Sequence, residues 1–168
     1  MNKSLRTKLA STEMLILDVD GVLTDGRLFY GSGGAEMKAF NVHDGYGLKK
    51  LQQEGISIAI VSGRTSDIVE KRADELEIRF LFQNVAHKNE ILAELTRKSG
   101  IDPRHMAHVG DDVPDLALFD SVGLGIAVAD ARLEVQKNAD FVTKAKGGEG
   151  AVREVCELLL ACRSNANQ

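Results

Sequence analysis

Short apolar runs alternate with amphipathic segments along most of the chain. The first run, Met14–Leu17, ends at a turn that contains glycine, and similar runs occupy residues 56–61, 105–109 and 122–128. Runs of this length, bounded by glycine and polar residues, are typical of strands buried in a parallel sheet. Shorter strands are expected at 80–82 and 141–142, and helices at 47–54, 66–76, 88–99, 114–119, 131–138 and 150–162. Such alternation predicts an α/β fold built on a doubly wound parallel sheet.

Three segments depart from this alternation. Residues 1–13 are expected to form a short leader with at most a helical turn. Residues 26–40 place apolar residues on both sides of a Gly-Ser-Gly-Gly turn, which predicts a β-hairpin flap. This hairpin holds several of the few aromatic residues, and it is too small to bury them alone. Residues 163–168 are polar and are expected to form a flexible tail.

Composition narrows the class of protein. The chain has 168 residues, 43% of them hydrophobic and 27% charged, which suits a single domain that spans residues 1–168. The net charge is −4, aromatic residues make up 5% and tryptophan is missing, so we expect no nucleic-acid partner. No apolar run approaches 18 residues, so we expect no membrane partner. With Cys156 and Cys162 read as buried thiols, a cytoplasmic protein is expected.

Polar residues follow the predicted strands at the point where each strand ends. Asp18 and Asp20 follow the first run, Ser62 follows the second, and Asp111 follows the run at 105–109, while Lys88 begins a predicted helix. An aspartate after a strand is often only a turn residue. Because ligands of open α/β sheets bind beyond the carboxyl ends of the strands, however, these side chains are expected to converge on one site.

Such a set of residues suits phosphoryl transfer. A carboxylate can attack phosphorus and form an aspartyl-phosphate, while a hydroxyl and an ammonium group hold the phosphate oxygens. A second carboxylate can protonate the leaving oxygen and then activate water. The carboxylates repel each other and the phosphate, and a divalent cation such as Mg²⁺ would relieve that repulsion.

Four segments taken in order, D-x-D-G-V-x-T, S-G-R, an isolated lysine and G-D-D-x-x-D, resemble the motifs of the haloacid dehalogenase superfamily. The resemblance implies that Asp18 is the nucleophile and Asp20 the general acid and base, with Ser62 and Lys88 holding the phosphoryl group. It further implies a Mg²⁺ ion bound by Asp18, Asp111 and Asp20, the last through its carbonyl or its side chain. Asp112 and Asp115 would support these ligands from behind, or one of them would reach the metal through a water molecule.

A narrower resemblance is carried by the hairpin with the K-A-F-N-V-H-D-G-Y-G segment after it, and by A-H-K-N-E, G-D-D-V-P-D and G-G-E-G-A-V-R-E-V. It points to the small, capless phosphatases that act on 3-deoxy-D-manno-octulosonate 8-phosphate. In that family the hairpin builds a tetramer and a neighbouring subunit covers the site, so a homotetramer is expected. No insertion in this chain is long enough for a cap domain.

The same resemblance implies a set of residues that bind the sugar-acid phosphate in addition to Asp20 and Lys88. They are Asn41, Val42, His43, Asp44, Gly45, Lys49, Arg64 and Arg72. Many members of the family carry arginine in place of His43. Arg64 and Arg72 match positions that meet the sugar carboxylate, with which arginine can make a bidentate contact, and Arg64 favours the eight-carbon over a nine-carbon substrate.

Alternative functions stay open at this point. The protein could act on another sugar-acid phosphate, such as that of a nine-carbon keto-sugar acid. It could be a non-catalytic oligomerisation domain, although the intact acidic residues and Lys88 argue against that. A phospho-receiver domain also uses an aspartate at a strand end, but it needs no second acid like Asp20.

Overall fold

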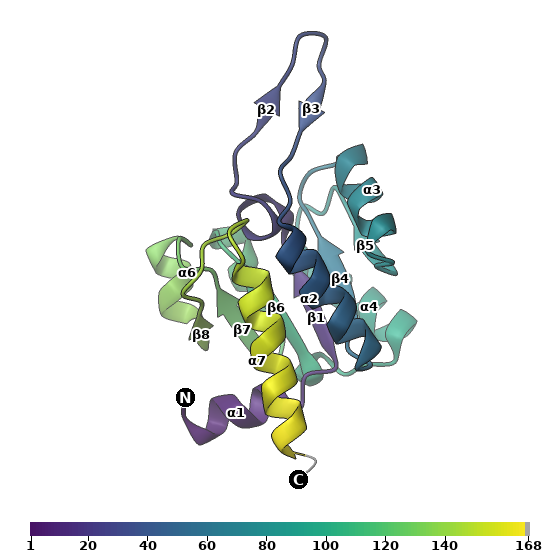
Figure 1. Ribbon diagram of the computed structural model, residues 1–168. Helices are drawn as coiled ribbons and strands as arrows, with labels where there is room; N and C mark the ends of the chain where they lie inside the picture. The colour runs from purple at the N-terminus through teal and green to yellow at the C-terminus, as the bar shows by residue number, and fades with distance from the viewer. Residues whose placement is uncertain (167–168) are drawn as a thin grey trace.

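A single parallel sheet forms the centre of the molecule (Figure 1). The computed structural model describes residues 1–166. Its six parallel strands lie in the order β5-β4-β1-β6-β7-β8. Their bounds are Met14–Leu17 for β1, Ser57–Val61 for β4, Phe80–Phe82 for β5, Met106–Gly110 for β6, Leu124–Ala127 for β7 and Phe141–Val142 for β8. The predicted doubly wound sheet is therefore confirmed, and β1, the first strand in the chain, lies between β4 and β6.

Helices cover both faces of this sheet. The helices are α1 (Lys3–Ala10), α2 (Val42–Gln53), α3 (Asp67–Glu75), α4 (Ile91–Ser99), α5 (Leu116–Phe119), α6 (Leu133–Asn138) and α7 (Ala151–Ala166). Leu15 and Leu17 of β1 pack in the core shared with α2 and α7, whereas Met14 and Ile16 pack in the core shared with α4. Successive side chains of a strand point to opposite faces, so one apolar run supplies both cores. Residues 1–166 contain no inserted cap domain, and none of their helices has the length and apolar character needed to cross a bilayer.

Helix α2 begins earlier than predicted. The sequence places its start at Gly47, but the helix begins at Val42, where the Asn41 side chain accepts a hydrogen bond from the backbone N–H of His43. Glycines in the first two turns conceal this helix, because glycine is a poor helix former. Gly47 is nevertheless needed, since a Cβ there would lie 3.0 Å from Arg153 and 3.1 Å from Cys156 of α7. The residues expected as a substrate-binding loop thus form the first turn of α2.

The two ends of the chain are more helical than predicted. The expected leader contains the eight-residue helix α1, which Asn2 caps and which packs Leu9 into the core. At the other end α7 continues through residues 163–166, which were expected in the flexible tail. The rest of that predicted tail, Asn167 and Gln168, lies outside the described residues.

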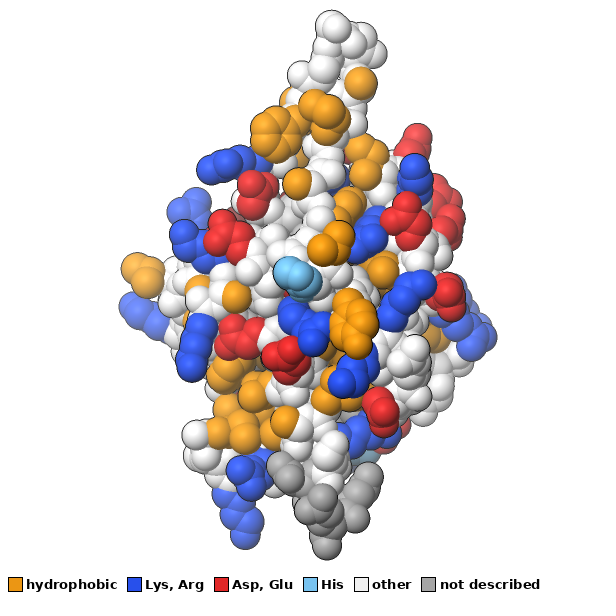
Figure 2. Space-filling model, viewed as in Figure 1, with side chains coloured by type: hydrophobic (Ala, Val, Ile, Leu, Met, Phe, Trp, Pro, Cys, Tyr) orange, Lys and Arg blue, Asp and Glu red, His pale blue; other side chains and the backbone are white. Residues whose placement is uncertain are grey.

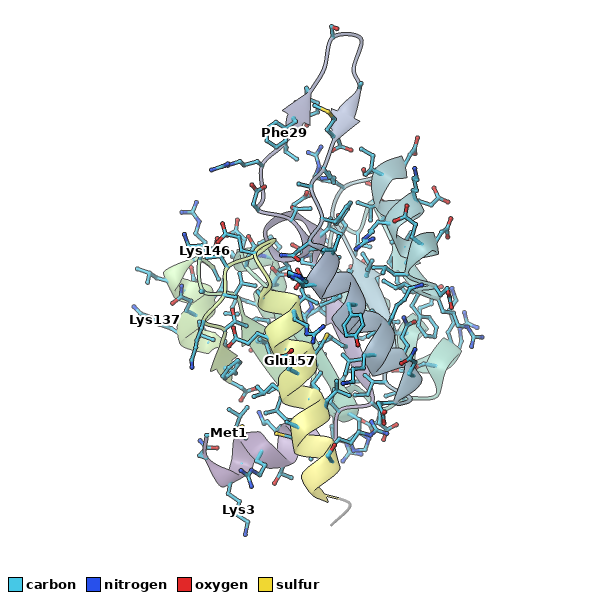
Figure 3. The ribbon with its side chains drawn as sticks, in the orientation of Figure 1. Met1, Lys3, Phe29, Lys137, Lys146 and Glu157 are labelled. Carbon is cyan, nitrogen blue, oxygen red and sulfur yellow. The ribbon has the colours of Figure 1, made fainter. Side chains whose placement is uncertain are left out.

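A hairpin extends from the body of the molecule beyond the carboxyl ends of the strands (Figure 1). Its strands, β2 (Phe29–Tyr30) and β3 (Glu36–Met37), pair antiparallel as predicted, although each is shorter than expected. The side chains of Phe29 and Met37 are 47% and 61% exposed. Apolar side chains gather on the hairpin in Figure 2, and Figure 3 shows Phe29 well outside the body. Large apolar side chains exposed together in this way are typical of an interaction surface.

Candidate active site

A cavity of about 460 Å³ lies at the carboxyl ends of β1, β4 and β6. This is where the polar residues that end the predicted strands were expected to meet. The cavity brings together Asp18, Asp20, Ser62, Arg64, Lys88, Asp111, Asp112 and Asp115. Residues from four separate segments of the chain therefore share one site.

Lys88 bridges two carboxylates inside this cavity. Its ammonium nitrogen lies 2.8 Å from Oδ1 of Asp18 and 2.6 Å from Oδ1 of Asp115. Burial alone would lower the pKa of Lys88, but the charges of Asp18 and Asp115 outweigh it and raise this pKa. Lys88 is thus a fixed cation beside the expected nucleophile, where a phosphoryl group would need positive charge.

Asp115 is buried behind the cavity and accepts several hydrogen bonds. Its Oδ1 faces Lys88 and Nε2 of His108, the latter at 2.9 Å, and its Oδ2 accepts from the backbone N–H groups of Asp111 and Asp112. Burial opposes ionisation, but the hydrogen bond from His108 and the charges of His108 and Lys88 prevail and lower the pKa of Asp115. Gly110 leaves the necessary space, since a Cβ there would lie 2.4 Å from Asp115.

His108 was not expected in the site. The sequence suggests only a packed or surface histidine, yet it lies within β6 with its ring buried against Phe119 and in contact with Asp115. A histidine inside an otherwise apolar strand, just before G-D-D, is the signal that would have found it. A buried polar ring requires partners, and the acid of the following turn is within reach.

Three carboxylates lie close enough to share a cation. Asp18, Asp111 and Asp115 each offer an oxygen within 4.8 Å of the others. Burial, together with the charges of Asp18 and Asp115, raises the pKa of Asp111 to about 8. Burial also raises the pKa of Asp18, and the charge of Lys88 only partly offsets this. Carboxylates that repel one another in this way suit a hard divalent cation, which prefers oxygen ligands.

The members of this acidic group differ in how many protein partners they have. Both Asp115 oxygens already accept hydrogen bonds, so this residue is suited to orienting the turn rather than to binding a cation directly. Asp112 caps the turn that follows, by accepting from the N–H of Val113. Asp18 and Asp111 are thus the side chains best suited to hold Mg²⁺. Gly21 allows this approach, since a Cβ there would lie 2.1 Å from Oδ2 of Asp111.

The side chain of Asp20 is directed to two cations instead. Its Oδ1 contacts the ammonium group of Lys38, and its Oδ2 lies 3.7 Å from Nε of Arg64. Of the two ways in which Asp20 was expected to reach the cation, these contacts favour its backbone carbonyl. Lys38 was missed, because a lone lysine at the end of a predicted hairpin does not show which way it points.

Ser62 and Arg64 belong to the turn after β4. The N–H of Ser62 donates to the carbonyl of Phe82, and its Oγ accepts from the N–H of Arg64 at 3.2 Å. The hydroxyl hydrogen of Ser62 therefore remains for another acceptor, such as a phosphate oxygen. Arg64 also donates to the Tyr30 hydroxyl at 3.0 Å, which links this turn to the hairpin.

The other residues expected to bind substrate do not line this cavity. Val42, His43, Asp44 and Gly45 form the first turn of α2, and Asp44 is buried against the start of α7. Asn41 donates to the carbonyl of Gly148. Farther along the molecule, Lys49 lies 3.3 Å from Glu77, and Arg72 lies 3.2 Å from Glu75.

The glycine-rich segment before α7 supports the turn that follows β1. A Cβ at Gly147 would lie 1.7 Å from the carbonyl oxygen of Gly21, and one at Gly148 would lie 2.5 Å from the N–H nitrogen of Asp25. The N–H of Gly148 also donates to the carbonyl of Val22. Lys146 in Figure 3 marks this segment, at the same end of the molecule as the base of the hairpin. Backbone packed against backbone thus fixes the turn that carries Asp20.

The site therefore combines a carboxylate beside a fixed cation with further acids that suit a metal ion, an arrangement that suits hydrolysis of a phosphate monoester. A family model for haloacid dehalogenase-like hydrolases matches residues 78–155. The chain is also 42% identical over 168 residues to the 3-deoxy-D-manno-octulosonate 8-phosphate phosphatase of Escherichia coli (strain B / BL21-DE3), covering all of this chain and 89% of that protein. The chain belongs to the haloacid dehalogenase-like hydrolases.

Solved structures give the same result. The 3-deoxy-D-manno-octulosonate 8-phosphate phosphatase from Yersinia pestis superposes with a TM-score of 0.96 at 40% identity, over 99% of this chain and 90% of that one. The phosphatase of that name from Moraxella catarrhalis, in complex with magnesium ion, phosphate ion and KDO, superposes with a TM-score of 0.95 at 42% identity, over 99% and 96% of the two chains. The whole described fold is therefore shared with these phosphatases.

Proposed function

We propose that this protein hydrolyses 3-deoxy-D-manno-octulosonate 8-phosphate to the free sugar acid and phosphate, with Mg²⁺ as cofactor, in lipopolysaccharide precursor synthesis. The observation that carries the proposal is the contact of Lys88 with Asp18 at the carboxyl end of the central strand. Relatives that are 42% identical over the full chain bear the name of this phosphatase. The same fold in Moraxella catarrhalis is described in complex with magnesium, phosphate and KDO.

The reaction uses Asp18 and Asp20 in two half-reactions. A carboxylate oxygen of Asp18 attacks phosphorus, the bond from phosphorus to the sugar oxygen breaks, and Asp20 gives its proton to that oxygen. Water then attacks the phosphorus of the aspartyl-phosphate while Asp20 takes a proton from it, and this step releases phosphate and restores Asp18. Lys88 and the hydroxyl of Ser62 bind the phosphate oxygens throughout, and both are buried, so they are held in place.

The acidic residues fit a magnesium ion. Asp18 and Asp111 would hold it with their side chains and Asp20 with its carbonyl, while Asp112 and Asp115 fix the turn that carries Asp111. When bound, Mg²⁺ supplies the positive charge that lets an anionic carboxylate approach an anionic phosphate.

Recognition of the sugar acid is assigned to two groups of residues. Arg64 lines the cavity and is placed to meet the substrate carboxylate. The second group is Asn41, Val42, His43, Asp44, Gly45, Lys49 and Arg72. This group lies outside the chain's own cavity, so its exposed members, such as Val42 and Lys49, fit a site that another copy of the chain completes, while the buried Asp44 and Gly45 would support them from within α2.

A homotetramer built through the hairpin would supply that neighbouring copy. The exposed apolar side chains of the hairpin support this arrangement, because they gain from burial against another subunit. The cytoplasm is the proposed location, where Cys156 and Cys162 would remain the buried free thiols that the structure shows.

Phosphate release from a panel of substrates tests the function. The panel holds the eight-carbon sugar-acid phosphate, a nine-carbon keto-sugar acid phosphate and simple hexose phosphates, each with Mg²⁺ and with a chelator. We expect the fastest phosphate release from the eight-carbon substrate. Both the chelator and the Asp18→Asn substitution should abolish this release. A preference for the nine-carbon substrate would retain the chemistry and refute the proposed sugar. No turnover by a folded, oligomeric protein would favour an assembly role instead.

A further inference from the structure

Lys38 is a buried cation to which the reaction above gives no role. It follows β3 where the hairpin returns to the body, and its side chain is 1% exposed. The ammonium group contacts Oδ1 of Asp20 and lies 3.4 Å from Oε1 of Glu36. A buried ammonium group is tolerated only when it is paired, so these two carboxylates determine where Lys38 lies.

Asp20 is held from two sides. Lys38 contacts one carboxylate oxygen from the hairpin, and Nε of Arg64 lies 3.7 Å from the other oxygen, from the turn after β4. The contact with Lys38 therefore fixes Oδ1 of Asp20, and the longer contact with Arg64 attracts Oδ2. Lys38 is the more deeply buried of the two cations, since the side chain of Arg64 is 42% exposed.

Glu36 connects this arrangement to the body of the protein. Its Oε2 accepts a hydrogen bond of 2.6 Å from the hydroxyl of Ser66, and its Oε1 accepts one of 3.3 Å from Arg64. Ser66 occupies the N-cap position of α3, but its side chain makes no capping hydrogen bond and its hydroxyl is directed to Glu36 instead. The hydrogen bond from Ser66 and the charge of Lys38 lower the pKa of Glu36 despite its partial burial, so Glu36 remains an anion. The contacts therefore run without a break from α3 through Glu36 and Lys38 to Asp20.

We propose that Lys38 is a positioning residue that holds the Asp20 carboxyl group at the leaving oxygen of the substrate. The inference rests on the proposed function, because it requires a phosphate ester whose leaving oxygen takes a proton from Asp20. As the bond from phosphorus to this oxygen breaks, the proton that Asp20 carries on Oδ2, the oxygen that Lys38 does not contact, moves to the leaving oxygen, and the bonding electron pair stays there. Displacing a catalytic group by about 1 Å costs about 10²-fold in rate, so losing the contact with Lys38 should slow this transfer.

Three phosphate esters separate this role from a structural one. The value of kcat/KM reports the steps up to departure of the leaving group, and therefore includes proton donation but not the later attack of water. For Lys38→Met we expect kcat/KM to fall by about 10²-fold with the sugar-acid phosphate. It should also fall clearly with phenyl phosphate, but by less than about threefold with 4-nitrophenyl phosphate. Nitrophenolate departs as an anion and needs no proton, whereas the sugar oxygen has to be protonated as it departs. The two aryl esters have similar shapes and no carboxylate, so they exclude an effect on recognition of the sugar acid.

Matched variants complete the experiment. Lys38→Arg keeps the charge and should restore most of the activity, and Lys98→Met, which removes an exposed lysine paired with Glu94 on α4, should leave all three values unchanged. If Lys38→Met does not fold, Lys38→Gln takes its place, since glutamine keeps a hydrogen-bond donor but carries no charge. The losses in kcat/KM on the three esters are then compared in the same way. Equal losses on all three esters would overturn the inference, as would a loss on the sugar-acid phosphate alone. A wild-type protein inactive on every ester would instead refute the proposed function, and the inference with it.

Discussion

Asp115 shows how much of the site depends on a residue behind the cavity. Its carboxylate accepts hydrogen bonds from Lys88, from His108 and from the N–H groups of Asp111 and Asp112. One buried side chain thus fixes both the cation beside Asp18 and the turn that carries Asp111. Removing one partner of a buried ion pair leaves the other charge uncompensated, which costs more than the pair itself contributes.

The Asp115→Asn variant should lower stability and activity together. The free energy of unfolding is expected to fall by about 3 kcal/mol, since Lys88 loses one of its two counter-charges while it stays buried. Urea denaturation measures this change. Asp74→Asn replaces an exposed acid on α3 and should change the free energy by less than about 0.5 kcal/mol. Equal small effects of the two variants would contradict the role given to Asp115.

Asp111 should make magnesium binding depend on pH. Its pKa is raised to about 8 by burial and by neighbouring carboxylates, so a proton competes with Mg²⁺ for it below that pH. Affinity is therefore expected to fall as pH falls from 8 to 6.5, by up to about tenfold for each pH unit. Titration calorimetry in buffers of different ionisation enthalpy should detect about one proton released at pH 6.5. An affinity that does not change with pH would refute this prediction.

At the scale of elements, α2 and α7 are joined by Asp44. Its Oδ1 accepts a hydrogen bond of 2.7 Å from the N–H of Arg153, while its Oδ2 has no hydrogen-bond partner among the described residues. Burial raises the pKa of Asp44 to about 6, and the N–H of Arg153 only partly offsets this effect. The unfolded chain releases this proton near pH 3.8, so the folded state binds it more tightly.

The contribution of Asp44 to stability is thus complete below about pH 4 and is lost as pH rises through about 6. Asp44→Asn keeps the carbonyl acceptor and removes the titration. Between pH 4 and pH 7.5, the stability of the wild type relative to this variant should fall by up to about 3 kcal/mol. Chemical denaturation at both pH values measures the difference, with Asp74→Asn as the exposed control. A difference that stays constant with pH would rule out this role for Asp44.

The elements also show what could be predicted from the sequence. The strands β1, β4 and β6 follow from apolar runs, and once they are parallel neighbours the acids and the serine at their ends must meet. The start of α2 could not be predicted from the sequence, because glycine disfavours a helix. Only the close approach of α7, seen in the folded protein, explains why glycine is present there. The partners of Lys38 and His108 were missed for a similar reason. They depend on how the hairpin and β6 are rotated in the folded protein, which local patterns do not encode.

At the scale of the whole molecule, the hairpin is the feature that a single chain does not account for. Phe29 and Met37 pair across β2 and β3, and both are exposed. At the base of the hairpin, Glu36 contacts Arg64 and Lys38 contacts Asp20, both residues of the active site. One element thus carries both the proposed subunit contact and part of the site, so assembly and catalysis are expected to depend on each other.

A double variant, Phe29→Ser with Met37→Ser, should break up the proposed homotetramer. Sedimentation velocity is expected to show a smaller particle, because the apolar surface that we propose as the subunit contact is lost. The circular dichroism spectrum should not change, since these side chains are exposed within the chain. Leu133→Ser removes an exposed apolar side chain from α6 and should leave the particle size unchanged. The same size in all three proteins would contradict assembly through the hairpin.

The backbone contact of Gly147 and Gly148 with the turn after β1 has a consequence for the order of events during synthesis. A ribosome makes the segment that holds this turn in place more than a hundred residues after Asp18 and Asp20. Until Gly147 and Gly148 emerge, a nascent chain carries every acidic residue of the site without the backbone that supports the turn of Asp20. Catalytic competence is therefore expected only once translation has passed Gly148.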